Sequence, residues 1–69
     1  MPDHNEALAS ALELLLINQN AIGAAVEELS NWVADRGSLD VADNITTALE
    51  TLDLNADGIG NAIRALRQG

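Results

Sequence analysis

The chain has 69 residues and a net charge of −8, with eleven acidic and three basic side chains, one tryptophan and no cysteine. The lack of cysteine excludes disulfides and cysteine-based zinc sites. The acidic balance disfavours direct binding to nucleic acid or to anionic lipid, because their phosphates repel an anionic surface. Alanine, leucine and isoleucine supply most of the apolar residues, which favours helices over a β-sandwich. We therefore expect one all-α domain over residues 1–69, without a cofactor or a metal.

The first predicted helix runs from about residue 4 to residue 36. At its start, Asp3 can act as N-cap and Glu6, three residues on, can bond back to it as in a capping box. Apolar residues then follow at alternating steps of three and four, which places them along one line of an α-helix. This predicted seam consists of Leu8, Leu12, Leu15, Gln19, Ile22, Val26, Leu29 and Val33.

The second predicted helix covers residues 39–67. Gly37 stands where a left-handed residue ends a helix, and Ser38 or Asp40 offers an N-cap oxygen for the next one. At about 1.5 Å per residue, two helices of this length form an antiparallel hairpin about 45 Å long. The seam of the second helix has no polar member and consists of Ala42, Ile45, Leu49, Leu52, Ala56, Ile59, Ile63 and Leu66.

Three glycines allow a different architecture. Gly23, Gly58 and Gly60 each weaken a helix by about 1 kcal/mol relative to alanine. A break at residues 18–23 or 53–60 would give a three-helix bundle monomer. The spacing of apolar residues continues unchanged through both segments, and this continuity favours the hairpin.

The residues beside the two seams predict an assembly. Of the 16 flanking positions, only Asp53 and Arg67 carry a charge, and most of the others are small or apolar. Such a face is too wide for one partner helix, and a chain this short buries only about 60% of its unfolded surface. We therefore predict that two hairpins form a four-helix bundle, in a parallel or an antiparallel arrangement. The predicted interface consists of Leu16, Gln19, Ile22, Gly23, Val26, Ala48, Leu52, Ala56, Ile59 and Gly60.

Gln19 is the one polar residue of the first seam and has two interpretations. It either bonds to its copy across a two-fold axis and fixes the register of the dimer, or lies half-exposed opposite Ala56. A second group of apolar residues falls outside the seams and is the candidate surface for a partner protein. The alternative is burial in the homo-oligomer or, for Trp32, a position in the core between helices. This group consists of Leu14, Ile17, Trp32 and Leu54.

One segment imitates a calcium site. Asp53, Asn55, Asp57 and Gly58 match the opening of an EF-hand loop over residues 53–64. Position 12 of such a loop supplies a carboxylate, and here it is Arg64. Helical spacing also continues through the segment, so calcium binding is an alternative and not the main prediction.

A second segment, Ser38, Leu39 and Asp40, resembles the "DSLD" start of helix II in acyl carrier proteins. The resemblance implies a carrier domain in which Ser38 bears the phosphopantetheine arm. Gly37 stands in place of the aspartate before the serine, and helical spacing occupies the place of the long loop that precedes the serine in that family. A carrier domain is therefore a second alternative.

The remaining polar residues show no catalytic pattern. His4 is the single histidine and lies at the start of a helix, and most carboxylates fall on faces that solvent covers. The N-terminal residues lack the features of a signal peptide, and the longest uninterrupted apolar run is Leu14–Ile17, so a cytoplasmic location is expected. The sequence thus predicts a non-enzymatic adaptor or regulator that acts through contacts between helices.

Overall fold

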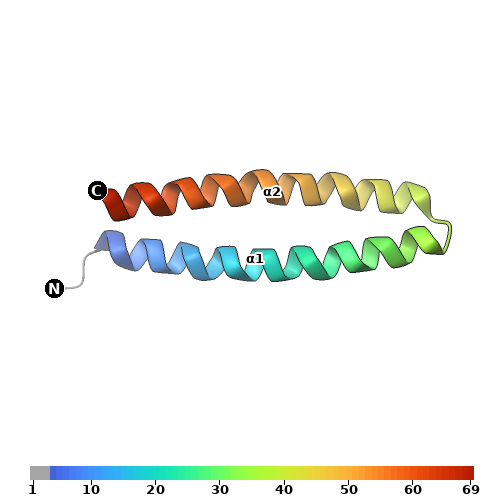
Figure 1. Ribbon diagram of the computed structural model, residues 1–69, viewed down its shortest axis with the longest axis horizontal. Coiled ribbons are helices and arrows are strands. Elements are labelled where there is room, and N and C mark those ends of the chain that lie inside the picture. Colours follow the sequence, from blue (N-terminus) through green and yellow to red (C-terminus); the bar gives the residue numbers. More distant parts are fainter. Residues whose placement is uncertain (1–3) are drawn as a thin grey trace.

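The structure, a computed structural model, describes residues 4–69. It consists of two α-helices, α1 (His4–Asp35) and α2 (Leu39–Gln68), joined by a short turn. The helices lie side by side and antiparallel, so that the start of α1 and the end of α2 meet at one end of a rod (Figure 1). The rod measures 55 × 15 × 10 Å along its principal axes. The predicted helical hairpin is confirmed, and the predicted N-cap, Asp3, lies outside the described residues.

Both helices pass through their glycines without a break. Gly23 lies inside α1, and Gly58 and Gly60 lie inside α2. Alanines flank Gly23, and the contact between the two helices stabilises them beyond their local propensity. The three-helix alternative is therefore wrong.

The turn ends α1 as predicted, through a left-handed glycine. Gly37 has a φ angle of +90°, and its N–H donates to the carbonyl of Ala34 at 2.9 Å. The N–H of Ser38 reaches back to the carbonyl of Val33 at 3.2 Å. These two bonds form a Schellman motif, which satisfies two carbonyls that the end of a helix leaves without a partner.

The start of α2 differs from the prediction. Ser38 occupies the N-cap position, but its side chain makes no capping hydrogen bond, and its backbone angles are φ −89° and ψ 68°. N-cap residues normally adopt a more extended backbone that brings the hydroxyl over the free N–H groups. Here the N–H of Ser38 bonds to Val33 in the Schellman motif of α1. This bond holds the Ser38 backbone in a conformation different from that of a normal N-cap. Asp40 lies within the first turn of α2, where its charge favours the helix dipole.

The seam of α2 is confirmed as the side that faces α1. All eight of its predicted members are buried or half-buried, with Ala42 and Ile63 each 8% exposed. Apart from Leu54 and small residues, polar side chains occupy the opposite side of the helix. The regular step of three and four thus identified the packed side of α2 correctly.

The seam of α1 was predicted wrongly at every second position. Leu8, Leu15, Ile22 and Leu29 are between 55% and 61% exposed. The positions directly after them face α2 instead, namely Ala9, Leu16, Gly23 and Ser30.

Small side chains explain this choice of packing side. Ala9 is fully buried, and a Cβ atom added to Gly23 would lie 3.9 Å from Cδ1 of Leu52. Ser30 is also buried, and its hydroxyl donates to the carbonyl of Ala42 at 3.5 Å. Three small residues let the backbones of α1 and α2 approach, whereas leucine or isoleucine at these positions would hold the helices apart.

Substitution of Gly37 by alanine tests the turn. Gly37→Ala is expected to lower the free energy of unfolding by about 1–2 kcal/mol, because a Cβ atom is strained at positive φ. The matched control is Gly58→Ala, since Gly58 is exposed, helical and has open space around its missing Cβ atom. The control is expected to raise the free energy of unfolding by about 0.5–1 kcal/mol. Thermal unfolding followed by circular dichroism, at one protein concentration, measures both, and equal shifts would contradict the assigned turn.

Candidate interaction face

A row of residues that is apolar except for Asn18 lies on the exposed surface of α1, beside the row that packs on α2. We call it the outer row. Its four large aliphatic members recur every seventh residue, and Trp32, at its end, is 55% exposed. All eight members are exposed, and they follow the same alternation of three and four that marks a packed helix surface. The outer row consists of Leu8, Ala11, Leu15, Asn18, Ile22, Ala25, Leu29 and Trp32.

A shallow groove separates the outer row from α2. Leu15 and Ile22 line it from α1, and Leu52 and Ile59 line it from α2. Its volume is about 580 Å³, and apart from Asn18 and Gln19 its lining is aliphatic. The apolar surface therefore continues from α1 across to α2.

The α2 border of this surface is also uncharged. We call it the α2 row, and its members recur every seventh residue next to the half-buried Leu52 and Ile59. Val41 is 49% exposed, and the other members are small or polar and also exposed. The α2 row consists of Val41, Ala48, Asn55 and Ala62. Together, the outer row, the groove and the α2 row form what we call the apolar face.

The turn end of the apolar face carries the single tryptophan. Ala25, Glu28, Leu29 and Trp32 line a second depression of about 430 Å³. The guanidinium of Arg36 lies 4.4 Å from the centre of the indole ring. This geometry is a cation–π contact, and it leaves more than half of the indole exposed.

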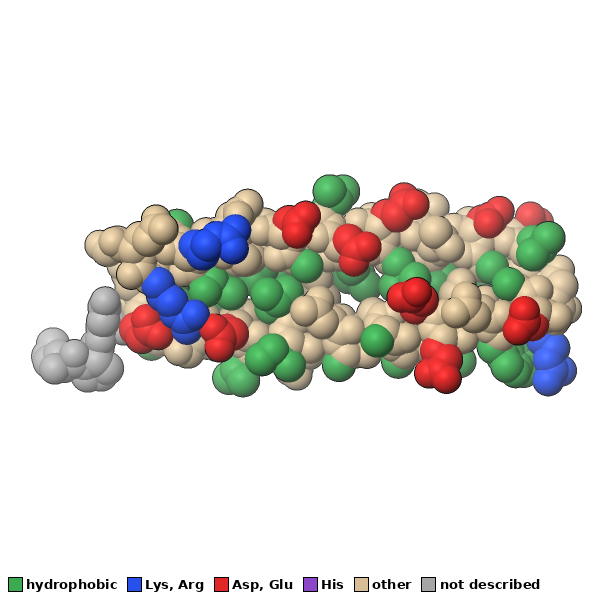
Figure 2. All heavy atoms as spheres, in the orientation of Figure 1, with side chains coloured by type: hydrophobic (Ala, Val, Ile, Leu, Met, Phe, Trp, Pro, Cys, Tyr) green, Lys and Arg blue, Asp and Glu red, His purple; other side chains and the backbone are tan. Residues whose placement is uncertain are grey.

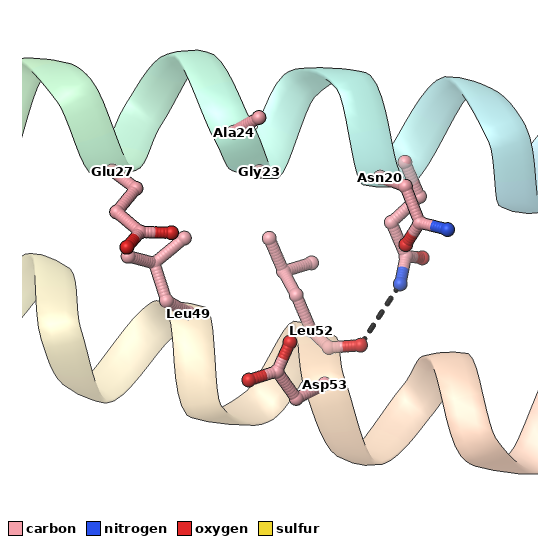
Figure 3. A pocket seen from close by; sticks show the side chains of 8 residues that line it. Asn20, Gly23, Ala24, Glu27, Leu49, Leu52 and Asp53 are labelled. Atoms are coloured by element: carbon pink, nitrogen blue, oxygen red, sulfur yellow. Dashed lines mark hydrogen bonds between the residues drawn. The ribbon is translucent and has the colours of Figure 1, made fainter.

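Charged residues gather on the other side of the hairpin. Figure 2 shows acidic side chains spread over both helices on the visible face, with apolar side chains in the valley between them and along the free edge of α1. Glu27 of α1 and Asp53 of α2 line the same small pocket, of about 190 Å³. In the close view, Glu27 points toward α2 beside Leu49, and Leu52 points toward α1 at Gly23 (Figure 3).

An arginine links the two helices at their open end. Arg67 of α2 bonds to Glu13 at 2.7 Å and to Glu6 at 3.2 Å, both on α1. The hydrogen bond to Glu13, with a further one to Glu6, holds the pKa of the Arg67 guanidinium above its ordinary value. Because all three side chains are well exposed, water and salt screen this cluster. It aligns the helix ends more than it stabilises the fold.

Gln19 has a bond that the sequence did not predict. Its side-chain Nε2 donates to the backbone carbonyl of Leu52 at 2.9 Å, so the amide is engaged within its own hairpin (Figure 3). The interpretation of Gln19 as a half-exposed residue opposite α2 describes its position. The hydrogen bond is to the carbonyl of Leu52, one helical turn before Ala56.

The predicted interface residues divide into two groups. Eight of them lie half-buried between α1 and α2 of one chain: Leu16, Gln19, Gly23, Val26, Leu52, Ala56, Ile59 and Gly60. Ile22 and Ala48 are exposed and belong to the apolar face, whose groove Gln19, Leu52 and Ile59 of the first group also line. At Gly60 an added Cβ atom would meet only Arg64 of the same helix within 4 Å, so no contact with α1 requires this glycine.

The four tentative partner-binding residues do not form one site. Leu14, Ile17, Trp32 and Leu54 are between 55% and 72% exposed. Only Trp32 belongs to the outer row, while Leu14 borders this row, Ile17 lies beyond Leu14 on the other flank of α1, and Leu54 lies on the side of α2 that points away from α1. The sequence therefore missed most of the outer row. A signal for the outer row was present in the sequence. Helix α1 carries two adjacent rows with the same spacing, and only one of them can face α2.

The two imitated motifs have no matching local structure. Residues 53–64 are helical throughout, and Arg64 bonds to the side chain of Asn61, so no loop wraps around an ion. Within residues 4–69, no group of three or more potential metal ligands comes together. Ser38 follows directly on α1 and its turn, without the long preceding loop of acyl carrier proteins.

Helix α1 also passes a simple test for membrane spans. By length and composition alone, it is long and apolar enough to cross a bilayer. The core helices of soluble proteins and the signal sequences of secreted ones pass the same test. The cytoplasmic location therefore stays a prediction.

No protein-family model, curated protein or solved structure matches this chain. The apolar face is thus the feature on which a functional proposal is based. It is continuous, it runs the length of the hairpin, and it carries no charge along either row.

Two substitutions of Gln19 test its bond to α2. Gln19→Leu removes only a donor, because the Leu52 carbonyl still accepts a bond inside α2, and it adds apolar contact. It is expected to raise the free energy of unfolding by up to about 1 kcal/mol. Gln19→Glu places a carboxylate against the Leu52 carbonyl and is expected to lower the free energy of unfolding by about 1–3 kcal/mol. Chemical denaturation at pH 7 measures both, and indistinguishable midpoints would refute the contact.

Proposed function

We propose that this protein is a non-enzymatic helical interaction module, an adaptor or regulator whose apolar face packs against helices of another chain. In this proposal two hairpins associate into a homodimeric four-helix bundle. The observation that carries the proposal is the outer row, which has the spacing of a packed helix surface but no partner within the hairpin.

The surface area of the hairpin supports association. A compact monomer of 7.2 kDa is expected to expose about 4,100 Å², whereas this chain exposes 5184 Å². The excess of roughly 1,000 Å² is close to the ~800 Å² that each partner buries in a standard interface. Within residues 4–69, the buried apolar residues are Ala9, Ala42 and Ile63, which is a small core for an independent domain.

The nature of the face favours a protein helix over a lipid bilayer. Asn18, Gln19 and Asn20 lie at the midpoint of α1, and Glu13 lies two turns before them. If α1 crossed a membrane, these polar groups would lie near the bilayer centre, where they are poorly tolerated. Against another helix, water and neighbouring side chains at the border of the interface satisfy them.

The mass of the protein in solution tests this proposal. Light scattering coupled to gel filtration at 10–200 μM is expected to give about twice the 7.2 kDa of one chain. Ile22→Glu places a charge in the apolar face and is expected to weaken the dimer roughly 100-fold or more. The matched control, Leu54→Glu, changes an exposed leucine on the outer side of α2 and is expected to leave the mass unchanged.

Trp32 supplies an independent signal. Its indole is 55% exposed in the hairpin, so its fluorescence is expected to shift to shorter wavelength as the concentration rises and the dimer forms. A mass of one chain at 200 μM together with unchanged emission would overturn the homodimer. Equal effects of Ile22→Glu and Leu54→Glu would show that the apolar face is not the contact.

A further inference from the structure

We propose that the occupant of the apolar face is a second copy of this chain, docked antiparallel so that the two α1 helices pack along their outer rows. This inference rests on the proposed homodimer and specifies its geometry. The two-fold axis lies at the height of Asn20 of α1 and Leu52 of α2, at the middle of the rod.

The sizes of the side chains in the outer row support this pairing. In an antiparallel pair centred on residue 20, two residues face each other when their numbers add up to 40. Ala11 then lies opposite Leu29 of the second copy, and Ala25 lies opposite its Leu15. Each alanine thus meets a leucine, which keeps the packing even along the interface.

The remaining positions of the outer row are consistent with the same register. Leu8 lies opposite Trp32 of the second copy, so the exposed indole gains a cover at each end of the dimer. Asn18 lies opposite Ile22, one layer from the axis, where a single polar residue fixes the register at some loss of stability.

A parallel arrangement pairs each residue with its own copy and packs less evenly. Ala11 would meet Ala11 and leave a gap, while Trp32 would meet Trp32 and crowd the turn end. It would also bring the two Glu28 carboxylates, which border the depression around Trp32, to the same level of the interface. A shift of the antiparallel register by seven residues would leave two members of the outer row uncovered in each copy, Leu29 and Trp32 in one direction or Leu8 and Ala11 in the other.

The α2 row has its centre at the same level as the outer row. Val41 pairs with Ala62, and Ala48 pairs with Asn55, about a point between residues 51 and 52. The hydrogen bond from Gln19 to the Leu52 carbonyl shows that this point and the centre of the outer row lie at one height in the hairpin. One two-fold axis therefore serves both rows.

The distribution of charge favours a second copy over a basic partner. Neither row contains a charged residue, and Glu6, Glu13, Glu27 and Asp53 lie on the other side of the hairpin. A cationic partner would find one carboxylate at the border of the face, Glu28 beside Trp32, and none along the two rows. A second uncharged face fits it, while the net charge of −8 on each chain stays at the outside of the bundle.

Spin labels test the arrangement directly, because the chain has no cysteine of its own. Asn31→Cys places a label at an exposed position near the turn. Asn20→Cys places a label at an exposed position at the height of the axis. In the antiparallel dimer, labels at position 31 are separated by about 33 Å along the rod, or more with the width of the bundle included. Labels at position 20 lie at the same height, so their separation is the width of the bundle alone.

Each alternative gives a different distance pattern by pulsed electron paramagnetic resonance. Two short distances together with a dimer mass would overturn the antiparallel arrangement and leave the proposed homodimer intact. A position-31 distance altered by about 10 Å would mean a shift of seven residues and would overturn the register. A monomer mass without any intermolecular distance would overturn both proposals.

A size swap tests the pairing of Ala11 with Leu29 in the unlabelled protein. Ala11→Leu alone sets leucine against leucine and is expected to weaken the antiparallel dimer about tenfold. Ala11→Leu combined with Leu29→Ala restores one large and one small residue in each pair, and is expected to recover most of the affinity. In a parallel dimer, Ala11→Leu would instead fill a gap and strengthen binding, and this result would overturn the proposal.

Discussion

The close approach of α1 to α2 is the constraint on which the rest of the structure depends. Ala9, Gly23 and Ser30 offer little bulk where the helices meet, and Leu52 fills the space beside the glycine. Two helices in contact bury one stripe of each, however close they come. Helix α1 carries two apolar stripes, so the packing that buries the row of small residues also exposes the row of large ones. Its exposed apolar surface is thus a direct result of how the hairpin packs.

Polar contacts then align the two helices without enclosing them. The Gln19 amide fixes the height of α1 against α2 at the centre of the rod, and Arg67 joins Glu6 and Glu13 at the open end. Because the arginine cluster is exposed, it adds little stability in water. The free energy of this small fold is therefore expected to depend strongly on what covers the apolar face.

The sequence predicted the helices, the turn and the packed side of α2, because each depends on local signals. The seam of α2 has no second row of large apolar residues beside it to compete for α1. The turn needs a glycine at position 37 because its backbone has a positive φ angle. On α1, two neighbouring rows have equal spacing, and periodicity alone does not say which one faces α2. The size of the residues decides it, since the row containing Ala9 and Gly23 permits the closer approach. The missing cap at Ser38 depends on its ψ angle, and the contacts of Gln19 and Arg67 depend on the alignment of two distant segments. None of these is visible in a single stretch of sequence.

The tight turn at Gly37 also determines the order in which the hairpin can fold. The further a contact between α1 and α2 lies from the turn, the more residues of chain separate its two partners. The Ser30 hydroxyl and Ala42 carbonyl are 12 residues apart, Gln19 and Leu52 are 33 apart, and Glu6 and Arg67 are 61 apart. Forming the last of these first would add about 1.4 kcal/mol of loop-closure entropy relative to the first. Loop closure therefore favours pairing of the helices from the turn, with the contacts of Glu6 and Glu13 with Arg67 the last to form.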